Sequence, residues 1–196
     1  MEPNSNPNYP KFYKKTYLNA IYLVKVREKE EKAKKLIKEH IEGEVGVAVS
    51  GKDSLVALSI TASVAEEKPF KFAAVISSHF IDQKLPKNII EELISIVKRF
   101  TDHVILHDEK WNAHANLFRL FATKYGFSTI VSGLRRVENG PHMAIERYNW
   151  GLLLNPIIHW NATEVWAYLN NYDIPVPRVY RDAMFPWTRL QDLAFR

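Results

Sequence analysis

The sequence predicts an α/β fold, a doubly wound and mostly parallel sheet of about five strands with helices on both faces. Short, mostly apolar runs at residues 45–49, 72–76, 103–107 and 128–132 have the length of buried strands. Between them lie longer segments in which apolar residues recur at helical spacing. Short strands that alternate with amphipathic helices are typical of a parallel sheet covered on both sides.

The composition is that of a globular protein, and 196 residues suffice for one substantial core. The chain contains no cysteine, which excludes a disulfide framework, a thiolate zinc site and a cysteine nucleophile. The net charge of +5 suits a phosphorylated ligand or RNA, and is equally ordinary for a mildly basic enzyme. There is no apolar run of membrane-spanning length and no signal-peptide core. We therefore expect a cytoplasmic protein without a membrane partner.

We divide the chain into an N-terminal segment, residues 1–24, and a single domain, residues 25–196. The first ten residues are rich in Asn and Pro, so we expect a mobile tail. The stretch that follows is aromatic and basic, with Phe12, Tyr13 and Tyr17. Such a stretch can stack on bases and contact phosphates, or it can pack its rings against the domain, as aromatic side chains more often do.

The helices are expected in order between the strands. The first, Val26–Ile41, carries opposite charges at i,i+4 and ends before Gly43. The helix after the first strand is expected to be capped by Ser54 and to bury Leu55 and Leu58. Later helices are expected after Pro86, over Trp111–Tyr125 and after Asn161.

The turn between the first strand and its helix is the most informative stretch. Ser50 and Gly51 end the strand, at a point where free backbone N–H groups and the positive end of the helix dipole meet. Such a point is an anion site. Gly51 lets the backbone approach the anion, Lys52 adds a positive charge and Ser54 adds a hydroxyl. Asp53 helps no anion by itself, but it suits a divalent metal bound together with phosphates.

These residues, 49–54, resemble the pyrophosphate loop (PP-loop), usually S-G-G-K-D-S, of the adenine-nucleotide α-hydrolase-like superfamily. The resemblance implies the HUP-type fold, binding of ATP or a related adenine nucleotide with Mg²⁺, and reaction at the α-phosphate. The chain has one glycine where the superfamily has two. Either the loop is one residue shorter, or Val49 and Ser50 fill the first two places, as in the small subunit of sulfate adenylyltransferase.

Three more loops, residues 77–82, 107–110 and 133–150, should reach the same edge of the sheet, because the carboxyl ends of parallel strands meet there. Ser77 and His79 follow the second strand and are candidate nucleotide contacts, with His79 directed to ribose or base. A plain polar loop is an equal interpretation for His79. His107 and Asp108 follow the third strand and are expected to be a solvated strand end.

The loop after the fourth strand holds Gly133, Arg135, Arg136 and Glu138. Adjacent arginines can grip phosphate or sulfate, and Glu138 can orient one of them or hold metal. A solvated charged loop is the alternative. The loop resembles the G-x-R-x-x-E-S motif of the phosphoadenosine-phosphosulfate reductase family, with Asn139 in place of the serine. Arg147 would serve as the basic residue that the family places shortly afterwards.

The resemblance to this family extends to about residues 40–182. Residues 155–169 resemble N/R-P-L-x-D-W-T-x-x-D-V-W-x-Y-I, and residues 174–180 resemble I-P-x-N-x-L-Y. Within the first motif, Asn161 and Glu164 have the spacing of a capping box, so its role is structural. In the family's reductases a cysteine near the chain end attacks the sulfonyl sulfur. The absence of cysteine here excludes a reductase of that mechanism.

Three functions remain. The first is a PP-loop enzyme, a nucleotidyl transferase or ATP pyrophosphatase, in which Lys52 offsets charge on the leaving pyrophosphate, Arg135 holds acceptor or phosphate, and Asp53 binds metal. The family implies sulfate or a flavin nucleotide as the acceptor. The second is a nucleotide-binding subunit or sensor without turnover, with a partner subunit or a second copy of the chain. The third is a tRNA-thiolating protein, a class that usually carries cysteines.

Overall fold

The computed structural model describes residues 15–80, 83–110, 114–139, 142–182 and 190. The predicted tail and the rings of Phe12 and Tyr13 lie outside these residues, as does the side chain of Glu138. Within the described part, no helix combines the length and the apolar character needed to cross a membrane.

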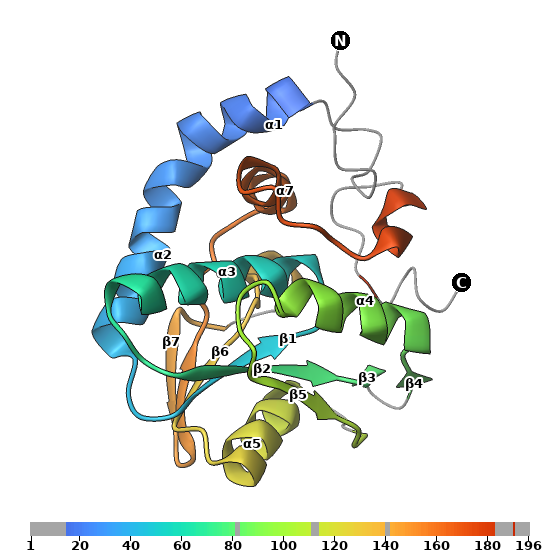
Figure 1. Cartoon of the computed structure of the whole chain (residues 1–196). Coiled ribbons are helices and arrows are strands. Elements are labelled where there is room, and N and C mark those ends of the chain that lie inside the picture. Colours follow the sequence, from blue (N-terminus) through green and yellow to red (C-terminus); the bar gives the residue numbers. More distant parts are fainter. Residues whose placement is uncertain (1–14, 81–82, 111–113, 140–141, 183–189, 191–196) are drawn as a thin grey trace.

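Six strands form one sheet, in the order β5-β2-β1-β6-β8-β7 (Figure 1). All neighbouring pairs are parallel except β8 and β7, which are antiparallel. The predicted doubly wound, mostly parallel sheet is confirmed. The strands are β1 Val45–Val49, β2 Phe72–Ser77, β5 Val104–His107, β6 Thr129–Val131, β7 Ile145–Tyr148 and β8 Gly151–Leu154; β3 His79–Phe80 and β4 Gln83–Lys84 pair separately.

Helices cover both faces of this sheet. Figure 1 shows α3, α4 and α7 on one side of the strands and α5 on the other. The strands alternate accordingly, because successive side chains of a strand point to opposite faces. In β8, Leu152 and Leu154 join the core beneath α3 and α7, whereas Leu153 joins the core beneath α5. The helices are α3 Lys52–Glu67, α4 Lys87–Val97, α5 His114–Tyr125, α6 Arg136–Asn139, α7 Ala162–Asn171 and the 3₁₀ turn η2 Arg178–Asp182.

The strand order determines where the loops of interest meet. From β1 the chain adds β2 and β5 on one side, and it then returns to place β6 on the other side. The order therefore reverses between β1 and β6. In open α/β sheets, ligands lie beyond the carboxyl ends of the strands at such a point. The loops after β1 and β6, which begin at Ser50 and Ser132, flank it.

The N-terminal helix is longer than predicted. It was expected to begin at Val26, but α1 Lys15–Ile21, the π-turn η1 Tyr22–Val26 and α2 Arg27–His40 follow one another without a break. Leu18, Tyr22 and Val26 recur every four residues and are buried, so the aromatic and basic segment contributes a helix face to the core.

The hairpin of β7 and β8 was not predicted. The sequence was interpreted as a loop from Gly133 to Trp150, yet residues 145–148 pair with residues 151–154. β7 is an edge strand whose residues are exposed or half-buried, which gives a weak apolar signal. Gly151 has a φ of +140°, and a Cβ there would strike the backbone of Ser128, so glycine is required at this turn.

Candidate functional site

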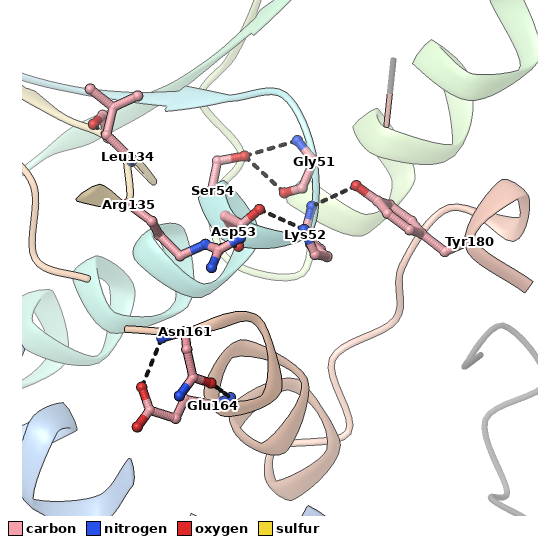
Figure 2. Close-up of polar contacts among 10 residues, drawn as sticks. Gly51, Lys52, Asp53, Ser54, Leu134, Arg135, Asn161, Glu164 and Tyr180 are labelled. Atoms are coloured by element: carbon pink, nitrogen blue, oxygen red, sulfur yellow. Dashed lines mark hydrogen bonds and ion pairs between the residues drawn. The ribbon is translucent and has the colours of Figure 1, made fainter. Parts of the chain in front are cut away.

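Ser54 fixes the shape of the loop after β1. α3 begins at Lys52, three residues earlier than a Ser54 cap would place it, and Gly51 is the N-cap residue. Ser54 Oγ accepts the N–H groups of Ser50 and Gly51 at 2.8 and 2.9 Å, and it donates to the Gly51 carbonyl oxygen at 2.8 Å (Figure 2). The prediction that Ser54 is the N-cap residue was therefore wrong. From the first turn of the helix, the Ser54 side chain instead hydrogen-bonds the backbone of Ser50 and Gly51 and so fixes the loop.

Three charged side chains meet at the start of α3. Lys52 Nζ lies 2.8 Å from Asp53 Oδ2, and Arg135 Nε, from the loop after β6, lies 2.7 Å from Asp53 Oδ1. Figure 2 shows Arg135 reaching across to Asp53. Lys52 and Arg135 are buried, at 0% and 1% exposure, and Asp53 is partly buried. The pairs between described side chains thus bring two cations and one carboxylate to the positive end of a helix, where an anion is stabilised.

Gly133 allows the two loops to approach each other. A Cβ at this position would lie 2.6 Å from the Asp53 carbonyl carbon and would also overlap the Ser54 backbone. Any larger residue would push the loop after β6 away from α3. Gly133 was predicted to contact the ligand; the contact that the structure gives it is with Asp53 and Ser54, which brings Arg135 to Asp53.

Tyr180 is a site residue that the sequence did not reveal. Its hydroxyl accepts the Lys52 backbone N–H at 3.2 Å, from a position 128 residues further along the chain (Figure 2). A Cβ on Gly51 would lie 2.8 Å from the same hydroxyl, so glycine is needed beneath the ring. Tyr180 is 1% exposed and packs edge-on against Trp166.

Comparison with known protein families identifies the chain. A family model for the phosphoadenosine phosphosulfate reductase domain matches residues 44–186. The chain belongs to this family. The matched residues of the reductase domain include the whole loop after β1, Arg135 and Tyr180. No curated protein sequence matches the chain.

Solved structures share the fold of this reductase domain at low sequence identity. Yeast FAD synthetase in complex with FAD is 18% identical, with a TM-score of 0.56 over 79% of this chain and 65% of that one. The FMN adenylyltransferase of Candida glabrata is 20% identical, with a TM-score of 0.62 over 85% and 66%. The U34-tRNA thiolase NcsA of Methanococcus maripaludis, with its [4Fe-4S] cluster, is 13% identical, with a TM-score of 0.58 over 91% and 70%. The chain thus spans just under two thirds of the first two proteins.

Ser77 and His79 belong to a second polar cluster, at the end of β2. Ser77 Oγ donates to the His79 carbonyl oxygen at 2.7 Å, and His79 Nδ1 lies 3.5 Å from Asp108 Oδ1. Ser78 also hydrogen-bonds Asp108, and Lys84 Nζ lies 2.9 Å from it. These hydrogen bonds from Ser78 and Lys84 lower the pKa of Asp108. Asp108 therefore stabilises the loop after β2 through its contacts with Ser78 and Lys84. The expectation that it is only a solvated strand end was incomplete.

The two adjacent arginines of the reductase domain separate. Arg135 turns inward to Asp53, whereas Arg136 is exposed and its backbone N–H donates to the Ile158 carbonyl oxygen at 2.9 Å. Arg147, proposed as a further basic site residue, is exposed on β7 opposite Leu152. That pairing places it towards the far end of the sheet from Ser132 and Gly133. The prediction that Arg147 joins the site was therefore wrong.

A polar network missed by the sequence analysis supports the loop after β6. Ser132 Oγ donates to Asn155 Oδ1, and Asn155 Nδ2 donates to Glu146 Oε1 at 3.0 Å. His142 Nδ1 lies 2.9 Å from Glu146 Oε1, and Tyr148 Oη donates to Glu146 Oε2 at 2.6 Å. Burial would raise the pKa of Glu146, but the bonds from Tyr148 and His142 outweigh it and lower this pKa. The network ties the loop to the β7–β8 hairpin.

Proposed function

We propose that the chain binds ATP or a closely related adenine nucleotide through the loop Ser50–Ser54 and acts at its α-phosphate. The observation that carries this proposal is the convergence of Lys52, Arg135 and the N-terminus of α3 on Asp53. The site lies at the reversal point of the sheet, where α/β folds bind their ligands. A di- or triphosphate group is the ligand that such a positive turn at a helix N-terminus would take.

The residues present fit a transfer reaction at the α-phosphate. An acceptor oxygen would attack the α-phosphorus, the bond to the bridging oxygen would break, and pyrophosphate would leave with the bonding electrons. Lys52 would offset the negative charge that grows on the leaving group. Arg135 would hold the α-phosphate or the acceptor. Asp53 already holds both side chains in place, so little reorganisation of Lys52 and Arg135 is needed when the nucleotide binds.

A magnesium ion fits this site only when it binds together with the phosphates of the nucleotide. Among the described residues no three His, Asp or Glu side chains cluster as a metal site would require. Asp53 would provide the protein ligand by giving up one of its two ion pairs, and the nucleotide would provide the rest, which is the usual arrangement for Mg²⁺. When bound, the ion would neutralise phosphate charge and orient the chain of phosphates.

The acceptor divides the enzyme proposal into two cases. Yeast FAD synthetase and the Candida glabrata FMN adenylyltransferase share the fold, which makes a flavin nucleotide the first acceptor to examine. Sulfate is the second, because an anionic acceptor would also suit Arg135.

A pyrophosphate-release assay tests the proposal. The protein is incubated with Mg²⁺ and ATP, with FMN or sulfate as acceptor. We expect release to depend on one acceptor and to fall at least about 100-fold in Lys52→Ala, because a charge-stabilising group is lost. Lys35→Ala, at an exposed lysine of α2, is the matched control and should keep full activity. Equal release from Lys52→Ala and wild type would contradict the proposal.

A nucleotide-binding subunit or sensor without turnover is the second candidate. The observation that favours it is that the N–H groups of Ser50, Gly51 and Lys52 already donate to side chains of this chain. Calorimetry separates the two candidates. Binding of Mg²⁺-ATP without pyrophosphate release for any acceptor would favour the sensor. Co-purification of tRNA would instead favour a thiolation protein, as in the Methanococcus maripaludis structure.

A further inference from the structure

Three backbone N–H groups of the loop after β1 already have hydrogen-bond acceptors in this chain. Two of them, from Ser50 and Gly51, donate to Ser54 Oγ, which lies within the loop itself. The third, from Lys52, donates to the hydroxyl of Tyr180, which belongs to a remote segment. The first-turn N–H groups of a helix are those that bind an anion. The Tyr180 hydroxyl therefore occupies the position that an anion oxygen would take at Lys52.

Tyr180 also covers Gly51 and Lys52. Its hydroxyl lies where Gly51 has no side chain, and both Gly51 and Lys52 are buried beneath it. Arg178, in the same 3₁₀ turn, holds the segment to α4, where its backbone N–H donates to Glu92 Oε2 at 2.7 Å. The covering segment is thus a structured element with its own attachment to the neighbouring helix.

We propose that Tyr180 is a positioning residue of the phosphate site: it holds the Lys52 N–H in the absence of ligand and is displaced by an oxygen of the bound pyrophosphate group. This inference rests on the proposed function of the loop. One N–H cannot donate at full strength to both oxygens. Phosphate binding and the contact between Tyr180 and Lys52 therefore exclude each other, and binding releases residues 178–182 from the loop.

Replacing the Tyr180 hydroxyl by a phosphate oxygen at the Lys52 N–H is favourable when the ligand is charged. An N–H bond to an ionised phosphate oxygen is about twice as strong as a bond to a neutral hydroxyl. The ligand must nevertheless displace an existing bond and its covering ring, which reduces its apparent affinity. By linkage, whatever stabilises the 3₁₀ turn Arg178–Asp182 in its present position weakens phosphate binding to the same extent. The contact of Arg178 with Glu92 is such a stabilising contact.

A purely structural role for Tyr180 makes a different prediction. Its ring packs edge-on against Trp166, and that contact needs no hydroxyl. Tyr180→Phe keeps the ring and removes only the oxygen that faces Lys52. If Tyr180 served packing alone, this change would leave phosphate affinity untouched.

Calorimetric titration with pyrophosphate and Mg²⁺ tests the inference. We expect Tyr180→Phe to bind pyrophosphate about three- to tenfold more tightly than wild type, since one competing hydrogen bond is lost. Tyr168→Phe is the matched control. Tyr168 is equally buried, but its hydroxyl lies 3.2 Å from Ser59 Oγ, away from the loop, so its pyrophosphate affinity should match wild type.

Limited trypsin digestion gives a second readout on the wild-type protein. Arg178 and Arg181 both lie in the covering turn, so pyrophosphate should accelerate cleavage after these residues if it releases the turn. Equal or weaker pyrophosphate binding by Tyr180→Phe, or cleavage that pyrophosphate leaves unchanged, would overturn the inference while leaving the loop as a phosphate site. If neither wild type nor Tyr180→Phe binds pyrophosphate, the proposed function fails as well.

Discussion

Asp53 is the residue at which the charges of the site meet. One carboxylate oxygen pairs with Lys52 and the other with Arg135, at 2.8 and 2.7 Å. Both cations are buried, and Asp53 gives each of them a counter-charge. Asp53 therefore holds together residues from two loops.

Asp53→Asn tests this description at the level of one side chain. We expect the free energy of unfolding to fall by about 3 kcal/mol, because Lys52 and Arg135 each lose a buried ion pair. Pyrophosphate binding without metal should become tighter, because the two positive charges are no longer offset. Urea unfolding and calorimetry measure the two effects.

Asp102→Asn is the control for this change, because Asp102 is exposed after α4, and it should alter neither quantity. An Asp53→Asn protein with wild-type stability and wild-type pyrophosphate affinity would show that the two ion pairs contribute nothing.

Part of the site could be predicted at the residue scale. Lys52, Asp53 and Ser54 follow a strand directly and begin a helix, and this local pattern suffices to predict an anion site. Arg135 follows another strand, and parallel topology brings the two loops together. Tyr180 could not be predicted, because its contact with Lys52 joins positions 128 residues apart and depends on how the C-terminal turn packs.

Among the elements, α7 begins as the sequence predicted. Asn161 Oδ1 accepts the Glu164 N–H at 2.9 Å, and the Glu164 carboxylate accepts the Asn161 N–H at 2.8 Å, which confirms the capping box (Figure 2). Lys29 of α2 lies 2.8 Å from the same carboxylate. The start of α7 is thus also its attachment to the N-terminal helix.

We expect Asn161→Ala to lower the free energy of unfolding by about 1 kcal/mol, because the Glu164 N–H loses its acceptor. Asn161→Ser should cost only a few tenths of a kcal/mol, since the serine hydroxyl still offers the Glu164 N–H an acceptor. Chemical denaturation gives both values. Equal losses for the two variants would mean that the cap bond is not the source of the effect.

The contact between the loop after β6 and the start of α3 is a second element-scale feature. We expect Gly133→Ala to cost about 3 kcal/mol of stability, because the new Cβ meets backbone atoms of Asp53 and Ser54 that cannot turn aside. Displacing this loop also moves Arg135, so pyrophosphate affinity should fall. Urea unfolding and calorimetry are the measurements.

Gly126→Ala is the comparison for Gly133→Ala. No atom lies within 4 Å of a Cβ at Gly126, and its φ of +75° makes the substitution cost about 1 kcal/mol through backbone strain alone. Its pyrophosphate affinity should stay at the wild-type value. Unchanged affinity in Gly133→Ala would separate this contact from the site.

Elements with a strong periodic signal were predictable, and those whose form depends on neighbours were not. β1 and β2 are runs of buried apolar residues, and α3 follows the turn between strand and helix. β7 has exposed residues and is ordered by pairing with β8. The helix over residues 15–26 was interpreted as an aromatic segment, because its buried face forms only against α7 and the core.

At the scale of the whole molecule, burial affects how stability varies with pH. His107, expected to be solvated, is fully buried at the end of β5, with Nδ1 2.9 Å from Tyr125 Oη and the ring edge-on to Phe121. Burial lowers the pKa of His107. The unfolded chain therefore takes up a proton near pH 6.5 that the folded chain resists.

The resulting stability should be fully present above about pH 6.5 and should decline as the pH falls towards the lowered pKa of His107. Urea midpoints at neutral and mildly acidic pH measure this decline, and His107→Gln should remove part of it. Glu146, whose pKa is also lowered, begins to affect stability only at more acidic pH than His107 does. An identical pH profile in His107→Gln and wild type would contradict the assignment.

The central claim is that the N–H groups of the loop after β1 bind the phosphates of a nucleotide. The most direct test follows the backbone amide resonances of isotope-labelled protein during titration with pyrophosphate and Mg²⁺. The account predicts saturable shifts that are largest at Gly51 and Lys52 and that share one dissociation constant. Saturable shifts centred instead on His79 and Asp108, or no shifts at any residue, would contradict it.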